Sequence, residues 1–169
     1  MKYDPDVHAK LAVLCTHKKI FEGAVVSYLK SAFPETGVVS TYDAAEIATP
    51  CIGVDFEPGA AQNKTVKTAL TGWHEDYIFA GSLAVQYISR RESSPAGHFD
   101  FVARLRAAFA AGFAMDSDNL PLSPLALAQI DFAGESSAYD DNYKADVTAL
   151  SFDVLYVISP EAFDQTVLQ

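Results

Sequence analysis

The clearest pattern in this chain is an alternation of apolar and polar residues over Trp73–Ser89. One parity carries the larger apolar side chains. The other carries mainly small or polar ones, with Ile78 and Ile88 as exceptions. A period of two is typical of a strand with one buried and one exposed face. The segment therefore predicts a long antiparallel strand whose buried parity is formed by Tyr77, Phe79, Leu83, Val85 and Tyr87.

The segment before residue 34 predicts a helix. Asp4-Pro5 is typical of a helix start, and apolar residues then recur at helical spacing up to Phe33. The polar group Thr16–Lys19 leaves open whether this is one helix or two. The predicted apolar stripe consists of Leu14, Phe21, Val25, Tyr28 and Leu29.

Strands are predicted between this helix and the long alternating segment. Val38–Thr41 is a short candidate, and Cys51–Glu57 alternates cleanly until Pro58-Gly59, which we expect to end it. Residues 58–72 have no clear period. A connection of that length exceeds ordinary hairpin loops and is expected to make contacts.

The second half of the chain predicts one more helix and two closing strands. The helix follows Pro95, with a stripe formed by Phe99, Val102, Leu105, Phe109 and Phe113. Leu125–Phe132 is a predicted strand, Gly134–Asp146 a polar loop, and the last strand ends at Ile158. Its buried face is expected to hold Leu150, Phe152, Val154, Tyr156 and Ile158.

Together these segments predict a single domain over residues 1–169 of the α+β class. It has one antiparallel sheet of about four to five strands and two main helices packed on one face. We expect a helical region, strands with a long loop, a helix, closing strands and a tail. Their ranges are 1–33, 38–92 with the loop 58–72, 95–115, 125–158 and 160–169.

Charge narrows the classes of function. The 22 acidic and 12 basic residues give a formal net charge of -10, and 50% of the 169 residues are hydrophobic. Electrostatic binding to nucleic acid, or to an anionic membrane, needs clustered Lys and Arg, so we expect neither. The N-terminus lacks a signal-peptide pattern, and no apolar stretch approaches the roughly 20 residues of a membrane span. We therefore expect synthesis in the cytoplasm.

The histidines give no strong catalytic or metal signal. His8, His17, His74 and His98 form no metal-binding spacing, and His98 and Asp100 would point to different sides of a helix. His74, Glu75 and Asp76 are the group with acid–base potential, because His74 and Asp76 share a strand face. A polar strand start with exposed charges is the favoured explanation for these residues.

The remaining reactive groups are expected to be structural. Asp116–Asn119 and Asp140–Asn142 lack the ligands of a calcium loop and are expected to be turns. Cys15 and Cys51 are expected to be inert thiols in the core. Surface ion pairs are expected for Arg90, Arg91, Arg104 and Arg106. We expect no cofactor, no metal and no enzymatic activity.

The order of elements resembles the tail terminator and tail-completion proteins of long-tailed bacteriophages. The segments that carry the resemblance cover most of the chain: the opening helix to Phe33, the strands Cys51–Glu57 and Tyr77–Ser89, the helix Phe99–Phe113, and the closing strand Asp146–Ile158. This family is marked by the order of its elements rather than by a motif. Tyr42–Thr49 and Gly134–Asp146 are surplus to a minimal member.

The resemblance implies a structural virion protein without catalytic residues, in a ring that is usually homohexameric. The ring would join the tail tube protein to a head connector or adaptor protein in the phage neck. Double-stranded DNA would pass through its lumen without specific binding, and no membrane is involved. An acidic lumen would suit this passage because like charges repel. The ring would be part of the virion after synthesis in the host cytoplasm.

Two alternatives remain open. One is another neck, adaptor or minor tail protein. The other, of a different class, is a small cytosolic α+β enzyme or ligand-binding domain that uses His74, Glu75 and Asp76. Contacts are expected through the loops 58–72 and 134–146 and the strand edges. The candidate interaction residues are Lys64, Lys67, Trp73, Tyr139 and Tyr143.

Overall fold

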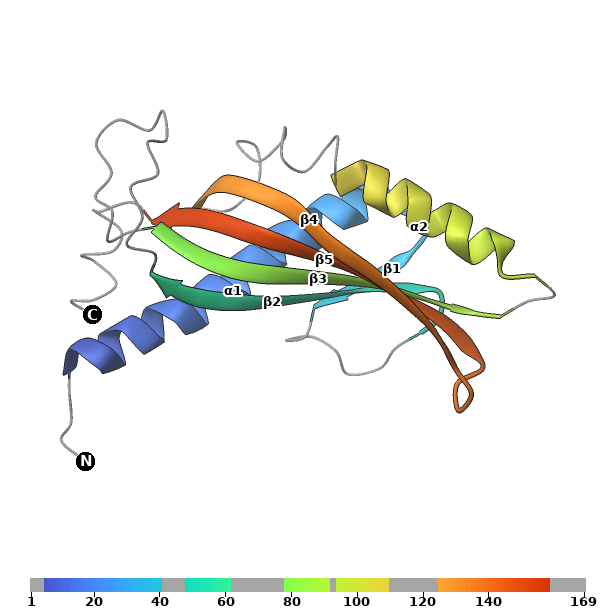
Figure 1. Ribbon diagram of the computed structural model, residues 1–169, viewed down its shortest axis with the longest axis horizontal. Helices are drawn as coiled ribbons and strands as arrows, with labels where there is room; N and C mark the ends of the chain where they lie inside the picture. The colour runs from blue at the N-terminus through green and yellow to red at the C-terminus, as the bar shows by residue number, and fades with distance from the viewer. Residues whose placement is uncertain (1–4, 41–47, 62–77, 92–93, 110–124, 159–169) are drawn as a thin grey trace.

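Two helices cover one face of a five-stranded sheet (Figure 1) in the computed structural model, which describes residues 5–40, 48–61, 78–91, 94–109 and 125–158. The element order is α1 (Pro5–Ala32), β1 (Gly37–Ser40), β2 (Cys51–Ala61), β3 (Ile78–Arg90), α2 (Ala96–Ala108), β4 (Leu125–Asp140) and β5 (Ala145–Ile158). The predicted α+β class, with the helices on one face, is confirmed. The domain bounds 1–169 stay a prediction.

The sheet is mixed rather than wholly antiparallel. Its strand order is β1-β2-β3-β5-β4; β1 pairs with β2 in parallel, and the other pairs are antiparallel. The segment 41–50 separates β1 from β2, and a parallel pair requires such a connection in place of a tight turn. The expectation of a purely antiparallel sheet was therefore wrong at one edge.

Helix α1 buries the predicted stripe against the sheet. Phe21, Val25 and Leu29 are fully buried, whereas the side chain of Leu14 lies outside the described part. The helix is continuous, so Thr16–Lys19 does not divide it. Within that polar group His17 is buried, because the helical period places it on the same side as Phe21.

The alternation in β3 has the predicted consequence. Phe79, Leu83, Val85 and Tyr87 face the helices and are buried, while the opposite parity is partly or fully exposed. Strand β5 behaves in the same way over Leu150, Phe152, Val154 and Tyr156. The sheet therefore has one covered face and one open face.

Aromatic rings fill the centre of the core. Phe21 stacks on Phe56 with ring centroids 4.3 Å apart, and Tyr156 stacks on Phe79 at 5.5 Å. Gly81 of β3 lies beneath the Phe56 ring, where an added Cβ would stand only 2.7 Å from the ring. Glycine at this position is therefore a packing requirement.

Helix α2 buries most of the predicted stripe, but His98 and Phe101 are buried at its start in place of Phe99. His98, Phe101, Val102, Leu105 and Phe109 are buried, whereas Phe99 is 45% exposed. Phe113 lies outside the described residues. Adjacent helical positions differ by about 100°, so placing a histidine on the buried face turns Phe99 outward. The predicted stripe contained only apolar residues and so did not include His98.

Two strands are longer than predicted. Strand β2 continues through Pro58-Gly59 to Ala61, where no β1 residue pairs with it and a proline without an N–H is tolerated. Strand β4 extends to Asp140, so the predicted loop Gly134–Asp146 shrinks to the turn 141–144. Strand β4 lies at the edge of the sheet, where polar residues are tolerated. The polar composition of its second half therefore led to the prediction of a loop.

Candidate assembly surfaces

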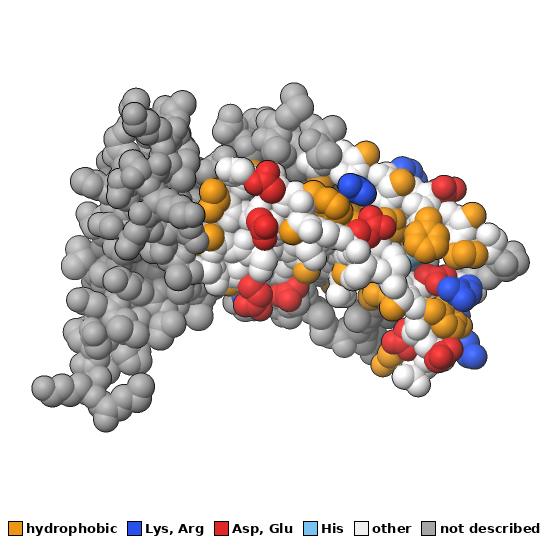
Figure 2. Space-filling model, viewed as in Figure 1, with side chains coloured by type: hydrophobic (Ala, Val, Ile, Leu, Met, Phe, Trp, Pro, Cys, Tyr) orange, Lys and Arg blue, Asp and Glu red, His pale blue; other side chains and the backbone are white. Residues whose placement is uncertain are grey.

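The open face of the sheet carries small and acidic side chains. Glu57, Ser82, Asp153 and Asp131 form one row of exposed residues that are directly paired across four strands. The central positions alternating onto this face include no Lys or Arg: Gly53, Asp55, Glu57, Ala80, Ser82, Ala84, Gln86, Gln129, Asp131, Gly134, Ser136, Ala149, Ser151, Asp153 and Leu155. In Figure 2 the red carboxylates cross this face, whereas most blue side chains gather toward α2 and the β4–β5 end.

This acidic row does not favour folding. Asp131 and Asp153 are direct cross-strand partners, and like charges in that arrangement destabilise a sheet. Nothing in the packing of the covered face requires carboxylates at these positions. We therefore regard the open face as a candidate functional surface.

One edge of the sheet is closed by side chains of α1. The Phe56 backbone N–H donates to Glu22 Oε1 at 2.9 Å, and Lys18 Nζ donates to the Phe56 carbonyl oxygen at 2.7 Å. Lys18 also contacts Glu22 at 3.0 Å and Asp55 at 2.7 Å. Burial opposes its charge, but the hydrogen bonds to Asp55 and Glu22 raise the pKa of Lys18 overall. Helix α1 thus occupies backbone groups to which another strand could otherwise pair.

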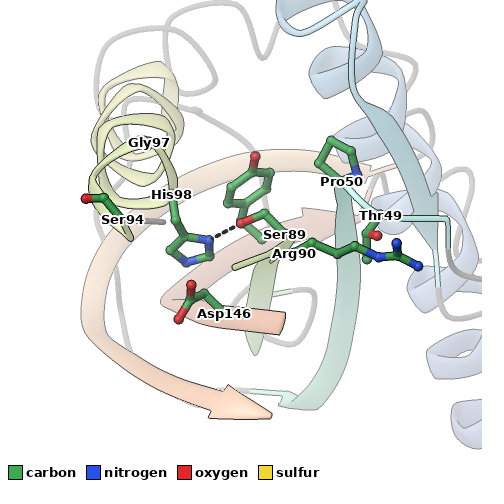
Figure 3. Close-up of a pocket in the computed structure, with 9 residues that line it drawn as sticks. Thr49, Pro50, Ser89, Arg90, Ser94, Gly97, His98 and Asp146 are labelled. Atoms are coloured by element: carbon green, nitrogen blue, oxygen red, sulfur yellow. Dashed lines mark hydrogen bonds between the residues drawn. The ribbon is translucent and has the colours of Figure 1, made fainter. Parts of the chain in front are cut away.

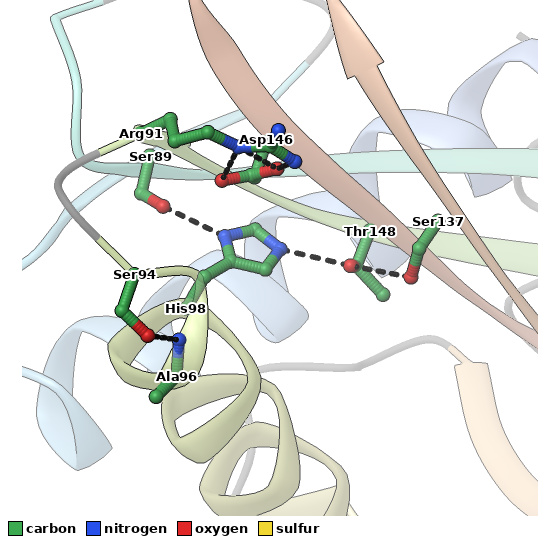
Figure 4. Close-up of polar contacts among 8 residues, drawn as sticks. All are labelled: Ser89, Arg91, Ser94, Ala96, His98, Ser137, Asp146 and Thr148. Carbon is green, nitrogen blue, oxygen red and sulfur yellow. Dashed lines mark hydrogen bonds and ion pairs between the residues drawn. The ribbon is translucent and has the colours of Figure 1, made fainter.

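At one end of the sheet, β4 and β5 extend as a hairpin (Figure 1), which is held by side-chain contacts next to its turn. The Arg91 guanidinium donates to both carboxylate oxygens of Asp146, at 2.5 to 3.1 Å, and lies 4.0 Å above the Tyr139 ring. The hydrogen bonds from Arg91 lower the pKa of the Asp146 carboxyl (Figure 4). The backbone N–H of Arg91 also donates a hydrogen bond to the Lys144 carbonyl oxygen at 3.0 Å.

The tip of the hairpin is an ordered turn. Asp140 Oδ1 accepts hydrogen bonds from the backbone N–H groups of Asn142 and Tyr143, at 2.9 and 3.2 Å. Lys144 adopts a left-handed backbone with φ of 53°. The turn presents Tyr143 with 77% of its surface exposed. The prediction of a turn at Asp140–Asn142 is confirmed.

His98 joins α2 to the sheet at the base of this hairpin. Its Nδ1 lies 2.7 Å from Ser89 Oγ, and its Nε2 lies 2.8 Å from Thr148 Oγ1 (Figure 4). Its ring stacks on Tyr87. Burial lowers its pKa, so the neutral imidazole is favoured. Figure 3 shows His98 facing a pocket of about 390 Å³, together with Ser89, Arg90 and Asp146. With both nitrogens engaged, His98 is positioned as a structural connector.

His17 is a second buried histidine. Its Nδ1 lies 3.1 Å from the Tyr156 hydroxyl, and burial lowers its pKa to about 4. Burial also raises the pKa of Tyr156. In the described part of the chain, no group of three or more His, Cys, Asp or Glu side chains could hold a metal ion.

The predicted interaction residues divide into two groups. Tyr139 and Tyr143 both lie near the tip of the hairpin: Tyr139 pairs with Asp146 just before the turn, and Tyr143 is in the turn. The other three, Lys64, Lys67 and Trp73, lie outside the described residues, as do Asp116–Asn119 and the alternative set of His74, Glu75 and Asp76.

The remaining predictions for individual side chains can be compared directly. Cys51 is buried, as predicted, and burial raises the pKa of its thiol. Arg91 pairs with Asp146, Arg104 lies 3.7 Å from Glu35, and Arg106 lies 3.7 Å from Glu135. The ion pairs predicted for Arg91, Arg104 and Arg106 are therefore present, whereas the partner of Arg91 and the roles of His17 and His98 were not predicted, because their partners lie in other elements.

Comparison with known proteins identifies a similar fold. A chain in the solved structure "Virion of native gene transfer agent (GTA) particle" has a TM-score of 0.51 and 16% identity, covering 80% of this chain and 93% of that one. A second solved chain has a TM-score of 0.46 and 16% identity, covering 83% of this chain and 92% of that one. No protein-family model and no curated protein matches.

At 16% identity, the likeness to the gene transfer agent chain shows a shared fold.

Within the described residues, no helix has the length and apolar character needed to cross a membrane.

Proposed function

We propose that this chain is a structural virion protein rather than an enzyme. In this proposal its copies form a ring at the end of a tail tube, as in the tail terminators that the element order resembles. The observation that carries the proposal is the open sheet face, whose central positions carry small side chains and carboxylates but no Lys or Arg, and which Lys18 of α1 reaches at its β2 edge, beside Asp55 and Glu57. The fold shared with a chain of a gene transfer agent virion supports the same class.

The open face is suited to line a channel for DNA. Phosphates would meet the carboxylates of Glu57, Asp131 and Asp153, and like charges oppose adhesion. Small side chains such as Ala84 and Ser151 add little bulk to the channel wall. In the ring, this face points to the lumen, and the helices point away from it.

The partners follow from this arrangement. Neighbouring copies form the ring, one rim meets the tail tube protein, and the other meets a head connector or adaptor protein. DNA passes through without specific binding, and the protein resides in the virion neck after assembly. A hexamer is the proposed stoichiometry.

Site-specific labelling tests the orientation. In a Cys15→Ser background, Ser82→Cys carries an electron-dense maleimide label on the open face, and Lys30→Cys carries it on α1, where position 30 is exposed. In electron micrographs of assembled rings, we expect the Ser82→Cys label inside the channel and the Lys30→Cys label outside it. The reverse arrangement would refute the proposed lumen face, and the absence of rings at any protein concentration would refute the ring.

A further inference from the structure

A groove between α2 and β4 is the second unusual surface of the molecule. It has a volume of about 510 Å³ and is lined by Phe99, Val102, Ala103, Arg106, Ala107 and Glu135. Phe99 is 45% exposed, and Phe132, in contact with Arg106, is 41% exposed. The other large hydrophobic side chain exposed in the described residues is Tyr143, at the hairpin tip. Exposed aromatic side chains gathered at a groove are typical of contact sites.

Arg106 of α2 keeps hydrogen-bond donors available at this groove. Arg106 lies 4.1 Å above the Phe132 ring and 3.7 Å from Glu135, which is too far for a hydrogen bond. A guanidinium has five N–H donors, so Arg106 can still receive an incoming carboxylate.

The hairpin tip has the complementary chemistry. It presents an exposed aromatic ring, Tyr143, next to the exposed carboxylate of Asp141. The turn holds both in place, because Asp140 caps its backbone and Arg91 braces its base. A preformed tip loses little conformational entropy when it binds.

The tip cannot reach the groove of its own chain. Strand β4 is extended from Glu135 to Asp140. At about 3.3 Å per residue, Asp141 therefore lies on the order of 20 Å along the strand from Glu135, the β4 residue that lines the groove with Arg106. Contact between the tip and a groove must join two copies through different surfaces. Such heterologous contacts generate rings when the rotation closes.

We propose that the β4–β5 tip of one copy docks into the α2–β4 groove of a second copy. Tyr143 packs against Phe99, and Asp141 pairs with Arg106. The inference rests on the proposed ring and names the contact between its neighbours. Each copy offers one tip and one groove, so every copy in a closed ring uses both.

Disulfide trapping tests this contact. The pair Tyr143→Cys and Ala103→Cys places one thiol on the tip and one in the groove, and Tyr143→Cys with Ser82→Cys is the matched control on the open face. Variants with only one of the added cysteines measure how much cross-linking the native Cys15 and Cys51 contribute. Under oxidising conditions, we expect a ladder of linked oligomers from the tip–groove pair alone.

The outcomes separate the two proposals. If the wild-type chain forms rings but the tip–groove pair gives no ladder, or no more than the control, the docking proposal is overturned and the proposed function stands. A ladder without closed rings supports docking and overturns the ring. A chain that neither assembles nor cross-links overturns both.

Charge reversal gives an independent readout. We expect Asp141→Arg or Arg106→Glu to raise the midpoint concentration of assembly about tenfold, and the double variant to recover most of this loss. Asp100→Arg, on α2 but outside the groove lining, is the control and should have little effect. Additive losses in the double variant would overturn the Asp141–Arg106 pairing.

Discussion

Replacing Glu22 by alanine should destabilise the fold strongly, although Glu22 belongs to neither proposed surface. The Glu22 side chain is 1% exposed, accepts a hydrogen bond from the Phe56 N–H at 2.9 Å and pairs with Lys18 at 3.0 Å. Its removal leaves a buried N–H without its acceptor, at a cost of about 1–3 kcal/mol. It also removes a buried partner of Lys18, although Asp55 still pairs with that ammonium. We expect a loss of roughly 2–4 kcal/mol.

The assay is equilibrium urea unfolding at pH 7, followed by circular dichroism. Glu57→Ala is the matched control, because Glu57 also faces Lys18, at 3.9 Å, but its side chain is 72% exposed. An exposed pair of this kind is worth about 0–1 kcal/mol. Glu22→Gln keeps an acceptor for the Phe56 N–H and should recover part of the loss. Equal losses for Glu22→Ala and Glu57→Ala would refute the reasoning about the sheet edge.

Three further predictions follow from other parts of the fold. Burial lowers the pKa of His17 to about 4, whereas the unfolded chain takes up a proton at this histidine near its ordinary pKa. The free energy of unfolding should therefore fall by about 3 kcal/mol from pH 7 to pH 4 because of His17. His17→Leu should remove this pH dependence in urea unfolding experiments. Arg91→Ala removes the contact with Asp146 and should speed hydrogen exchange of the hairpin amides, with Arg90→Ala as the control. An equal increase in the exchange rate for both variants would argue against a bracing role of Arg91. Gly81→Ala should lower the melting temperature by several degrees and Gly53→Ala should not, since a Cβ meets a ring at 81 and nothing at 53.

Much of the covered face could be predicted from sequence because its signals are local. The period of two in β3 and β5 and the apolar stripe of α1 each lie within one segment, so Leu83, Phe152 and Val25 were assigned correctly to the core. The limits of β2 and β4 were predicted less well. At a sheet edge, proline and polar residues such as Pro58 and Ser137 are tolerated, and composition no longer separates strand from loop.

The candidate surfaces were only partly predictable. Tyr139 and Tyr143 were chosen from the sequence as interaction residues and stay a prediction, and the acidic net charge predicts an acidic surface without saying where it lies. The row of carboxylates and the groove depend on register between strands that are distant in sequence. His98 shows the same limit, because its partners Ser89 and Thr148 come from two other elements. A periodicity argument treats such a histidine as polar and exposed.

The most direct test of the central claim is the cryo-electron microscopy structure of the assembly that the chain forms at high concentration. We predict a closed ring whose channel is lined by the open sheet face, with Glu57, Asp131 and Asp153 toward the lumen and α1 and α2 outside. A ring with the helices toward its channel, or a chain that stays monomeric at every concentration, would contradict the claim.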